Sequence, residues 1–412
     1  MKKALMMKKY ADLIAEVGIN CNPKQDVYIV ADVQMATFVR YLVMRLYAKK
    51  ARSVEVDYYD TQIDKQSLMR QSITKLSQVS EWEVLKMKER TDRHFAKITL
   101  VGSDPMAYKE VSSSHIKAYS SKRAEILRPY RDKYSSNELA WCVAACPTPA
   151  WAKRVFPHLS RTQAEMELWK KIYEACRIKE ENDPVQEWKN HIASLNQRAD
   201  ALNKYHFVAL RYNNSLGTNL TVGLEKDHIW VAAQSKQKFN DEFFTPNLPT
   251  EEIFTCPDAN NINGICYSSK PLCYKGQMID KFYFEFKDGK IVNYGAEVGY
   301  DTLKSIVETD EGSLSLGEAA LVPYQSPISL QNIVYQETLF DENASCHLAI
   351  GDSYPETVTN YDELSEEEKK ANGINSSLTH VDFMIGTKDL SIVGITADGR
   401  EVQVFQDGNF VI

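Results

Sequence analysis

Short apolar runs alternate with amphipathic stretches over the first half of the chain. Four runs have the composition of buried strands, and they cover residues 26–33, 53–59, 97–103 and 141–147. Residues 34–50 instead show the apolar spacing of an amphipathic helix. Strands that alternate with helices in this way predict a mostly parallel sheet covered by helices.

Two further helices are predicted at the end of this half, over residues 161–204. Ser160 and Gln163 have the spacing of a capping box, in which each residue satisfies a backbone N–H of the other at the start of a helix. These two helices complete the first domain. The sequence therefore predicts an α/β N-terminal domain with a mostly parallel sheet at residues 1–204.

The pattern changes after about residue 205 to short strands and tight turns. Asp288 and Gly289 stand between two alternating apolar segments, which is the strongest local signal of a β-hairpin. We therefore expect an α+β C-terminal domain with antiparallel strands at residues 205–412. This domain also contains most of the candidate chemistry.

The segment 377–386, SLTHVDFMIG, predicts one of its strands. Apolar or β-branched residues occupy every odd position from 379 to 385, so His380 and Asp382 lie on the opposite face of that strand. Residues two apart on a strand are roughly 7 Å apart, so both side chains can reach one shared ligand such as a metal. The alternative is a surface strand with two solvated polar side chains.

Composition and charge exclude several classes of function. The chain has 412 residues, 43% of them hydrophobic and 25% charged, which is typical of a globular protein with more than one domain. Its net charge of −7 argues against binding to nucleic acid, which needs a concentrated basic face. No segment has the roughly 18 consecutive apolar residues of a membrane span. The eight scattered cysteines predict a reduced, cytoplasmic setting.

Several common catalytic motifs are missing from the sequence. No two glycines are separated by a single residue, so the chain has no G-x-G-x-x-G dinucleotide-binding loop. It also lacks the P-loop, H-E-x-x-H and G-x-S-x-G motifs. The predicted parallel sheet is therefore not expected to bind a nucleotide through a standard loop.

Acidic residues and histidines recur instead along the second half. The candidates are Glu251, Glu252, Glu318, Glu342, His347, Tyr354, His380 and Asp382. Each has a structural alternative when taken alone, because a glutamate beside a turn is usually solvated and a histidine before an apolar run is usually a packed residue.

Taken together, these residues balance the charge of a metal pair. Two divalent cations bring four positive charges, and Glu252, Glu318, Glu342 and Asp382 bring four negative ones, which leaves His347 and His380 as neutral nitrogen ligands. A donor set that is rich in oxygen with fewer imidazoles suits zinc, cobalt, manganese or magnesium without selecting among them.

Four segments of the second half resemble the signature blocks of one known family. They are NLPTEEIFTCPD, ETDEGSLSLGEAALVPYQSPIS, LFDENASCHLAIG and LTHVDFMIG, in that order. In sequence and spacing they are similar to the aminopeptidase T and aminopeptidase S family of dinuclear metallo-aminopeptidases. The resemblance extends over most of the chain, including its N-terminal half.

The resemblance implies a role for each candidate residue. It implies that two metal ions are held in the C-terminal domain by Glu252, Glu318, Glu342, His347, His380 and Asp382. It places Tyr354 at the same site and leaves a catalytic role for Glu251 open. It further implies peptide substrates with a free N-terminus and a cytoplasmic homodimer.

The chemistry of a metal pair then suggests a mechanism. Two cations about 3.5 to 4 Å apart lower the pKa of a water molecule and polarise the scissile carbonyl. Glu342 or Glu251 is then the candidate general base, and Tyr354 the candidate hydrogen-bond donor to the developing oxyanion.

Two other functions are open at this point. The first is a non-haem iron oxygenase, because H-x-D followed by a distal histidine forms the facial triad of that class. His380 is the last histidine of the chain, so the usual order is not met. The second is a scaffold or binding protein that has kept the fold and lost turnover.

Overall fold

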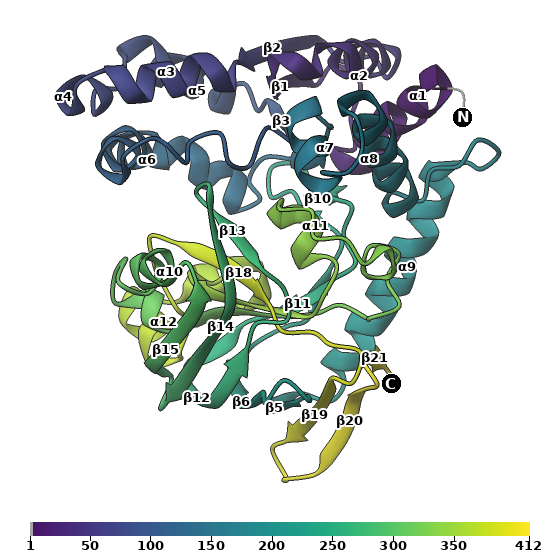
Figure 1. Cartoon of the computed structure of the whole chain (residues 1–412). Helices are drawn as coiled ribbons and strands as arrows, with labels where there is room; N and C mark the ends of the chain where they lie inside the picture. The colour runs from purple at the N-terminus through teal and green to yellow at the C-terminus, as the bar shows by residue number, and fades with distance from the viewer. Residues whose placement is uncertain (1–2) are drawn as a thin grey trace. The chain divides into compact units, whose positions relative to one another are not determined.

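The computed structural model describes residues 3–412, which form two compact units (Figure 1). The first unit contains the described residues up to Asn190 together with Gln234–Pro249, and the second contains His191–Ala233 and Thr250–Ile412. The predicted division into two domains between residues 204 and 205 stays a prediction.

A five-stranded parallel sheet forms the centre of the first unit (Figure 1). Its strands lie in the order β10 (Asn247–Leu248), β4 (Trp141–Ala145), β3 (Ala96–Val101), β1 (Asp26–Asp32) and β2 (Ser53–Tyr59). All four pairings in this sheet are parallel. Central strand β1 is buried over almost its whole length, as expected for a strand covered on both faces. The predicted mostly parallel sheet is confirmed.

Helices precede, connect and follow the strands β1 to β4 of this sheet. They are α1 (Lys3–Leu13), α2 (Ala36–Ala48), α3 (Thr61–Arg70), α4 (Ile73–Leu76), α5 (Glu81–Asp92), α6 (Ser113–Ser135), α7 (Pro149–Val155), α8 (Arg161–Ala175) and α9 (Pro184–Asn203). The predicted capping box is present at the start of α8, because the Ser160 and Gln163 side chains satisfy each other's backbone N–H groups. The unit boundary at residue 190 falls inside α9. A two-stranded ribbon, β8 (Ser235–Lys236) with β9 (Phe243–Phe244), belongs to the same unit.

The second unit contains two antiparallel sheets. The larger consists of β5 (Phe207–Asn213), β6 (Asn219–Leu224), β12 (Pro257–Tyr267), β13 (Leu272–Tyr274), β14 (Gln277–Lys287), β15 (Lys290–Val298), β19 (Ser391–Thr396), β20 (Glu401–Gln406) and β21 (Asn409–Phe410). Its β14–β15 hairpin turns at Asp288 and Gly289, which both have positive φ as a type I′ turn requires. The hairpin prediction is therefore confirmed.

The smaller sheet carries most of the candidate site. Its strands lie in the order β18 (His380–Met384), β17 (His347–Gly351), β16 (Leu316–Leu321), β11 (Ile253–Thr255) and β7 (Val231–Ala232), with antiparallel pairing throughout. Three short helices complete the unit: α10 (Tyr300–Val307), α11 (Thr338–Glu342) and α12 (Glu366–Ala371). A parallel sheet followed by antiparallel sheets is the fold class that the sequence predicts. None of the helices between residues 3 and 412 has the length and apolarity to cross a membrane.

Candidate metal centre

Neighbouring strands of the smaller sheet bring the candidate ligands together. Glu252 directly precedes β11, Glu318 lies in β16, and His347 is the first residue of β17. His380 and Asp382 both lie on β18, the edge strand beside β17. The predicted strand around His380 is present, and alternate residues Val381 and Phe383 are buried beneath it.

Glu318 lies between the two histidines. One of its carboxylate oxygens is 3.7 Å from Nε2 of His347, and the other is 3.1 Å from Nε2 of His380. Glu252 approaches His347 Nε2 to 3.3 Å, and Asp382 approaches His380 Nε2 to 3.2 Å. The five residues thus form two groups that share Glu318, and each group has three possible ligand atoms within 4.8 Å of one another.

Both histidines are oriented by backbone carbonyls. Nδ1 of His347 lies 3.0 Å from the carbonyl oxygens of Glu342 and Ser345, and Nδ1 of His380 lies 2.7 Å from that of Asp352. A carbonyl can only accept, so in each neutral ring Nδ1 carries the proton and Nε2 keeps its lone pair toward the carboxylates. This is the usual outer hydrogen bond of a metal-ligating histidine.

The donor set fits a divalent cation. Nε2 of His380 is buried and forms no hydrogen bond within the described residues, although two carboxylate oxygens lie near it. Lone pairs on Nε2 and on carboxylate oxygens repel each other unless a proton or a cation lies between them. The cluster of Glu252, Glu318 and His347 is almost completely buried, where such repulsion is least screened.

The pKa shifts of the cluster reflect the same shortage of positive charge. Burial by itself would lower the pKa of His347, but contacts with Glu252 and Glu318 raise it well above its ordinary value. At His380, burial again lowers the pKa, but the carboxylates of Asp382 and Glu318 outweigh it. The pKa of His380 is therefore also raised well above its ordinary value. Without a cation, these imidazoles therefore bind the protons that offset the surrounding negative charge.

Glu342 lies beside the two groups and outside both of them. Burial, followed by the charges of Asp382 and Glu252, raises the pKa of its carboxyl well above the ordinary range. Its Oε1 is 3.4 Å from the side-chain amide of Asn343, which donates to it. Glu342 thus adjoins the cluster through a hydrogen bond with the side chain of Asp382.

Tyr354 faces His380. The centres of their rings are 4.6 Å apart, and the ring of Phe254 lies 5.8 Å from that of Tyr354. Burial and the neighbouring carboxylates, Glu318 foremost, raise the pKa of the Tyr354 hydroxyl well above its ordinary value. The hydroxyl therefore keeps its proton and can act as a hydrogen-bond donor beside the cluster.

Glu251 has a different partner from Glu252. Its Oε2 lies 3.6 Å from Nε2 of His191, which comes from α9. Its backbone N–H donates to the side-chain oxygen of Asn343 at 2.8 Å. Glu251 is therefore close to the cluster in sequence but belongs to neither group of possible ligands.

Three supporting residues were missed by sequence reasoning. Asn343 contacts both acidic segments, because it accepts from the backbone of Glu251 and donates to Glu342. The hydroxyl of Thr250 donates to Oε1 of Glu252 at 3.4 Å. The carbonyl oxygen of Thr250 lies 2.9 Å from Nε2 of His191. Asn343 and Thr250 each adjoin an acidic candidate in the sequence, which was the available signal, whereas nothing local singles out His191.

The carboxylates and imidazoles that meet on the smaller sheet could hold a divalent cation with mostly oxygen ligands. The chain belongs to the thermophilic metalloprotease (M29) family, whose model matches residues 4–410. The predicted resemblance to aminopeptidases T and S is thereby confirmed. The protein is a metallo-aminopeptidase, a hydrolase of peptide bonds, and its family implies a divalent metal cofactor. The oxygenase and scaffold alternatives do not fit this family.

Similar proteins support this assignment over the full chain. Aminopeptidase AmpS of Bacillus subtilis (strain 168) is 41% identical over 404 residues, which is 98% of each chain. Aminopeptidase T of Thermus aquaticus is 34% identical, again over 98% of each chain. The solved structure of wild-type AmpT from Thermus thermophilus superposes with a TM-score of 0.93 at 30% identity and covers 100% of both chains.

Proposed function

We propose that this enzyme removes N-terminal amino acids from peptides at a dinuclear metal site. The proposed ligands are Glu252, Glu318, Glu342, His347, His380 and Asp382. The position of Glu318 carries the proposal, because its two carboxylate oxygens face two different histidines, so each oxygen would be available to a separate cation. Zinc, cobalt, manganese and magnesium all suit these donors.

Divalent cations at this site would supply Lewis acidity and lower the pKa of a nucleophilic water. The chain itself supplies the proton transfers. Glu342 and Glu251 lie outside the two compact groups, so either carboxylate, where it is not fully occupied as a metal ligand, could take a proton from the attacking water and deliver it to the leaving amine. His191 lies beside Glu251 and can orient its carboxylate.

Tyr354 is proposed to stabilise the oxyanion of the tetrahedral intermediate. Its proton is retained because burial and the surrounding carboxylates disfavour the phenolate. Packing against Phe254 and His380 fixes the ring, so the hydroxyl is pre-oriented and loses little entropy on donating.

Replacing Tyr354 by phenylalanine should lower kcat and leave metal content unchanged. The loss of one oxyanion donor costs about 2.7 to 4 kcal/mol in transition-state stabilisation, which corresponds to about 10²- to 10³-fold in kcat. Steady-state kinetics and metal analysis of the purified variant test this. A change confined to KM would place Tyr354 in substrate binding instead.

A free α-amine should be required for cleavage. The dense negative charge around Glu318 and Asp382 favours a cationic or metal-binding amine at the end of the substrate. We expect hydrolysis of short peptides and aminoacyl anilides, and no hydrolysis of their N-acetylated forms, when the enzyme is assayed with added metal. Equal cleavage of free and acetylated substrates would contradict the aminopeptidase proposal.

Three wider features are proposed from the resemblance. We infer a cytoplasmic homodimer with an α/β domain at residues 1–204 and the metal site in the domain at residues 205–412. Light scattering after size-exclusion chromatography tests the dimer directly. A monomer at micromolar concentration would contradict it.

A further inference from the structure

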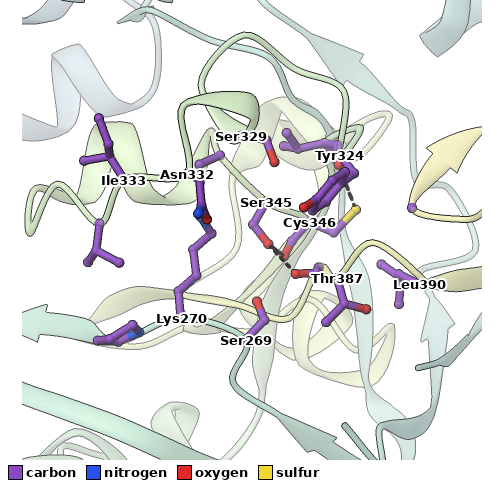
Figure 2. Close-up of a pocket in the computed structure, with 16 residues that line it drawn as sticks. Ser269, Lys270, Tyr324, Ser329, Asn332, Ile333, Ser345, Cys346, Thr387 and Leu390 are labelled. Carbon is purple, nitrogen blue, oxygen red and sulfur yellow. Dashed lines mark hydrogen bonds between the residues drawn. The ribbon is translucent and has the colours of Figure 1, made fainter. Parts of the chain in front are cut away.

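A cavity of about 270 Å³ lies in the second unit, beside the start of β17 (Figure 2). Its wall is formed in part by the loop that joins β12 to β13, with Ser269 and Lys270, and in part by Ser345 and Cys346. The volume is slightly below that of sites for drug-sized ligands, so it suits a ligand the size of one or two amino-acid residues. None of the roles assigned above uses this cavity.

Lys270 brings an unpaired positive charge to the cavity. Its side chain points into the cavity on the side of Asn332 (Figure 2). Among residues 3–412, no carboxylate forms an ion pair with it. Burial lowers the pKa of Lys270, and the only opposing influence is the charge of Asp341. The Asp341 carboxylate already accepts from the backbone N–H groups of Tyr335 and Glu337, at 2.7 and 3.2 Å.

Ser269 adds a second unsatisfied donor next to this lysine. Its Oγ is buried and has no hydrogen-bond partner within the described part of the chain. The backbone N–H of Ser269 donates to the carbonyl of Met384 at 2.8 Å, which fixes the loop against the end of β18. A buried hydroxyl without a partner costs free energy unless a ligand satisfies it. An ammonium and a hydroxyl that line the same cavity are suited to a carboxylate.

The cavity is close to the proposed metal centre. Ser345 lines it, and the carbonyl of Ser345 accepts from Nδ1 of His347 at 3.0 Å. Met384, which holds the Ser269 loop, is the register partner of His347. An extended peptide advances about 3.3 Å per residue, so a di- or tripeptide spans roughly 7 to 10 Å.

We propose that Lys270 and Ser269 bind the C-terminal carboxylate of a di- or tripeptide whose N-terminal residue is cleaved at the metal centre. The inference rests on the proposed aminopeptidase function and adds the substrate class to it. Short peptides with a free C-terminus are then preferred, because longer peptides cannot place their terminal carboxylate in the cavity. A free amino acid offers the same carboxylate chemistry and is the other possible source.

The decisive comparison is between a tripeptide and its C-terminal amide. We expect the metal-loaded wild type to cleave the free acid with at least about tenfold higher kcat/KM than the amide, mainly through KM. Lys270→Gln should remove this preference and leave hydrolysis of an aminoacyl anilide unchanged. Ser269→Ala should reduce the preference by a smaller factor. Lys287→Gln, at an exposed lysine on β14, is the matched control and should behave as the wild type.

Three results would overturn the inference. They are equal kcat/KM for acid and amide in the wild type, an equal loss of both in Lys270→Gln, and a loss of the preference in Lys287→Gln. Unchanged anilide hydrolysis shows that Lys270→Gln is folded. Failure of the aminopeptidase proposal looks different, because then the anilide is not cleaved by any variant.

A binding measurement separates the two carboxylate sources without turnover. Calorimetric titration with N-acetyl-leucine should show binding to the wild type and none to Lys270→Gln. If this binding competes with the tripeptide in the kinetic assay, the peptide terminus is supported as the natural ligand. Binding that leaves tripeptide KM unchanged would reassign the cavity to a free carboxylate and overturn the proposal for the substrate.

Discussion

Glu318→Gln should nearly abolish peptidase activity and remove bound metal. Glu318 offers one carboxylate oxygen to each of the two ligand groups, so its amide analogue weakens both groups at once. Loss of an outer partner of a metal ligand already costs 10- to 100-fold in affinity or activity, and we expect a larger loss for a shared ligand. Activity and metal content of the purified variant are measured side by side.

Glu225→Gln is the control for this substitution. Glu225 is as deeply buried as Glu318 and belongs to the same unit, but it lies outside both ligand groups. Burial raises the pKa of the Glu225 carboxyl, so a neutral amide is compatible with its surroundings. We expect the control to keep activity and metal. If Glu318→Gln kept both as well, the two groups would not form a metal centre.

Local patterns were enough to predict where most elements and most candidate residues lie. The alternation around His380 predicts a strand with His380 and Asp382 on one face, and β18 has both side chains in contact. The shared position of Glu318 could not be obtained in this way. It depends on the register between β16 and β17, which shifts at an irregularity between Leu316 and Glu318.

Long-range contacts account for what the sequence did not predict. β10 joins the parallel sheet of the first unit beside β4, although it lies about 100 residues further along the chain. A strand of two residues, Asn247–Leu248, is too short to show any periodicity. His191 and Glu251 likewise meet across 60 residues, so no local spacing relates them.

Removal of metal should destabilise the second unit as well as stop catalysis. Without cations, Glu252, Glu318 and Asp382 lie close together, and burial together with the charges of Glu318 and Asp382 raises the pKa of the Glu252 carboxyl. A ligand that binds only the native state adds RT ln(1 + [L]/Kd), about 2.7 kcal/mol at a hundredfold excess over Kd. We therefore expect the chelated protein to melt several degrees lower than the metal-loaded protein.

The difference in melting temperature should grow as pH rises above about 6.5. The pKa values of His347 and His380 are raised in the folded, metal-free protein, so their protonation stabilises that state below 6.5 and is lost as pH rises through the raised values. Metal binding needs both imidazoles to be neutral, so it is favoured as the pH rises. The metal-free protein loses stability with rising pH, whereas the metal-loaded protein is protected.

Thermal unfolding at pH 6, 7 and 8 tests this dependence. The protein is exhaustively chelated and then supplied with zinc, cobalt, manganese or magnesium, and Glu318→Gln is treated in the same way. The variant should gain less from metal, because it has lost the shared ligand and carries one negative charge fewer in the metal-free cluster. Neither ligand group found among residues 3–412 includes a residue of the first unit, so its transition should move little where the two units unfold separately. Identical melting curves with and without metal at all three pH values would mean that these residues do not bind metal as one site.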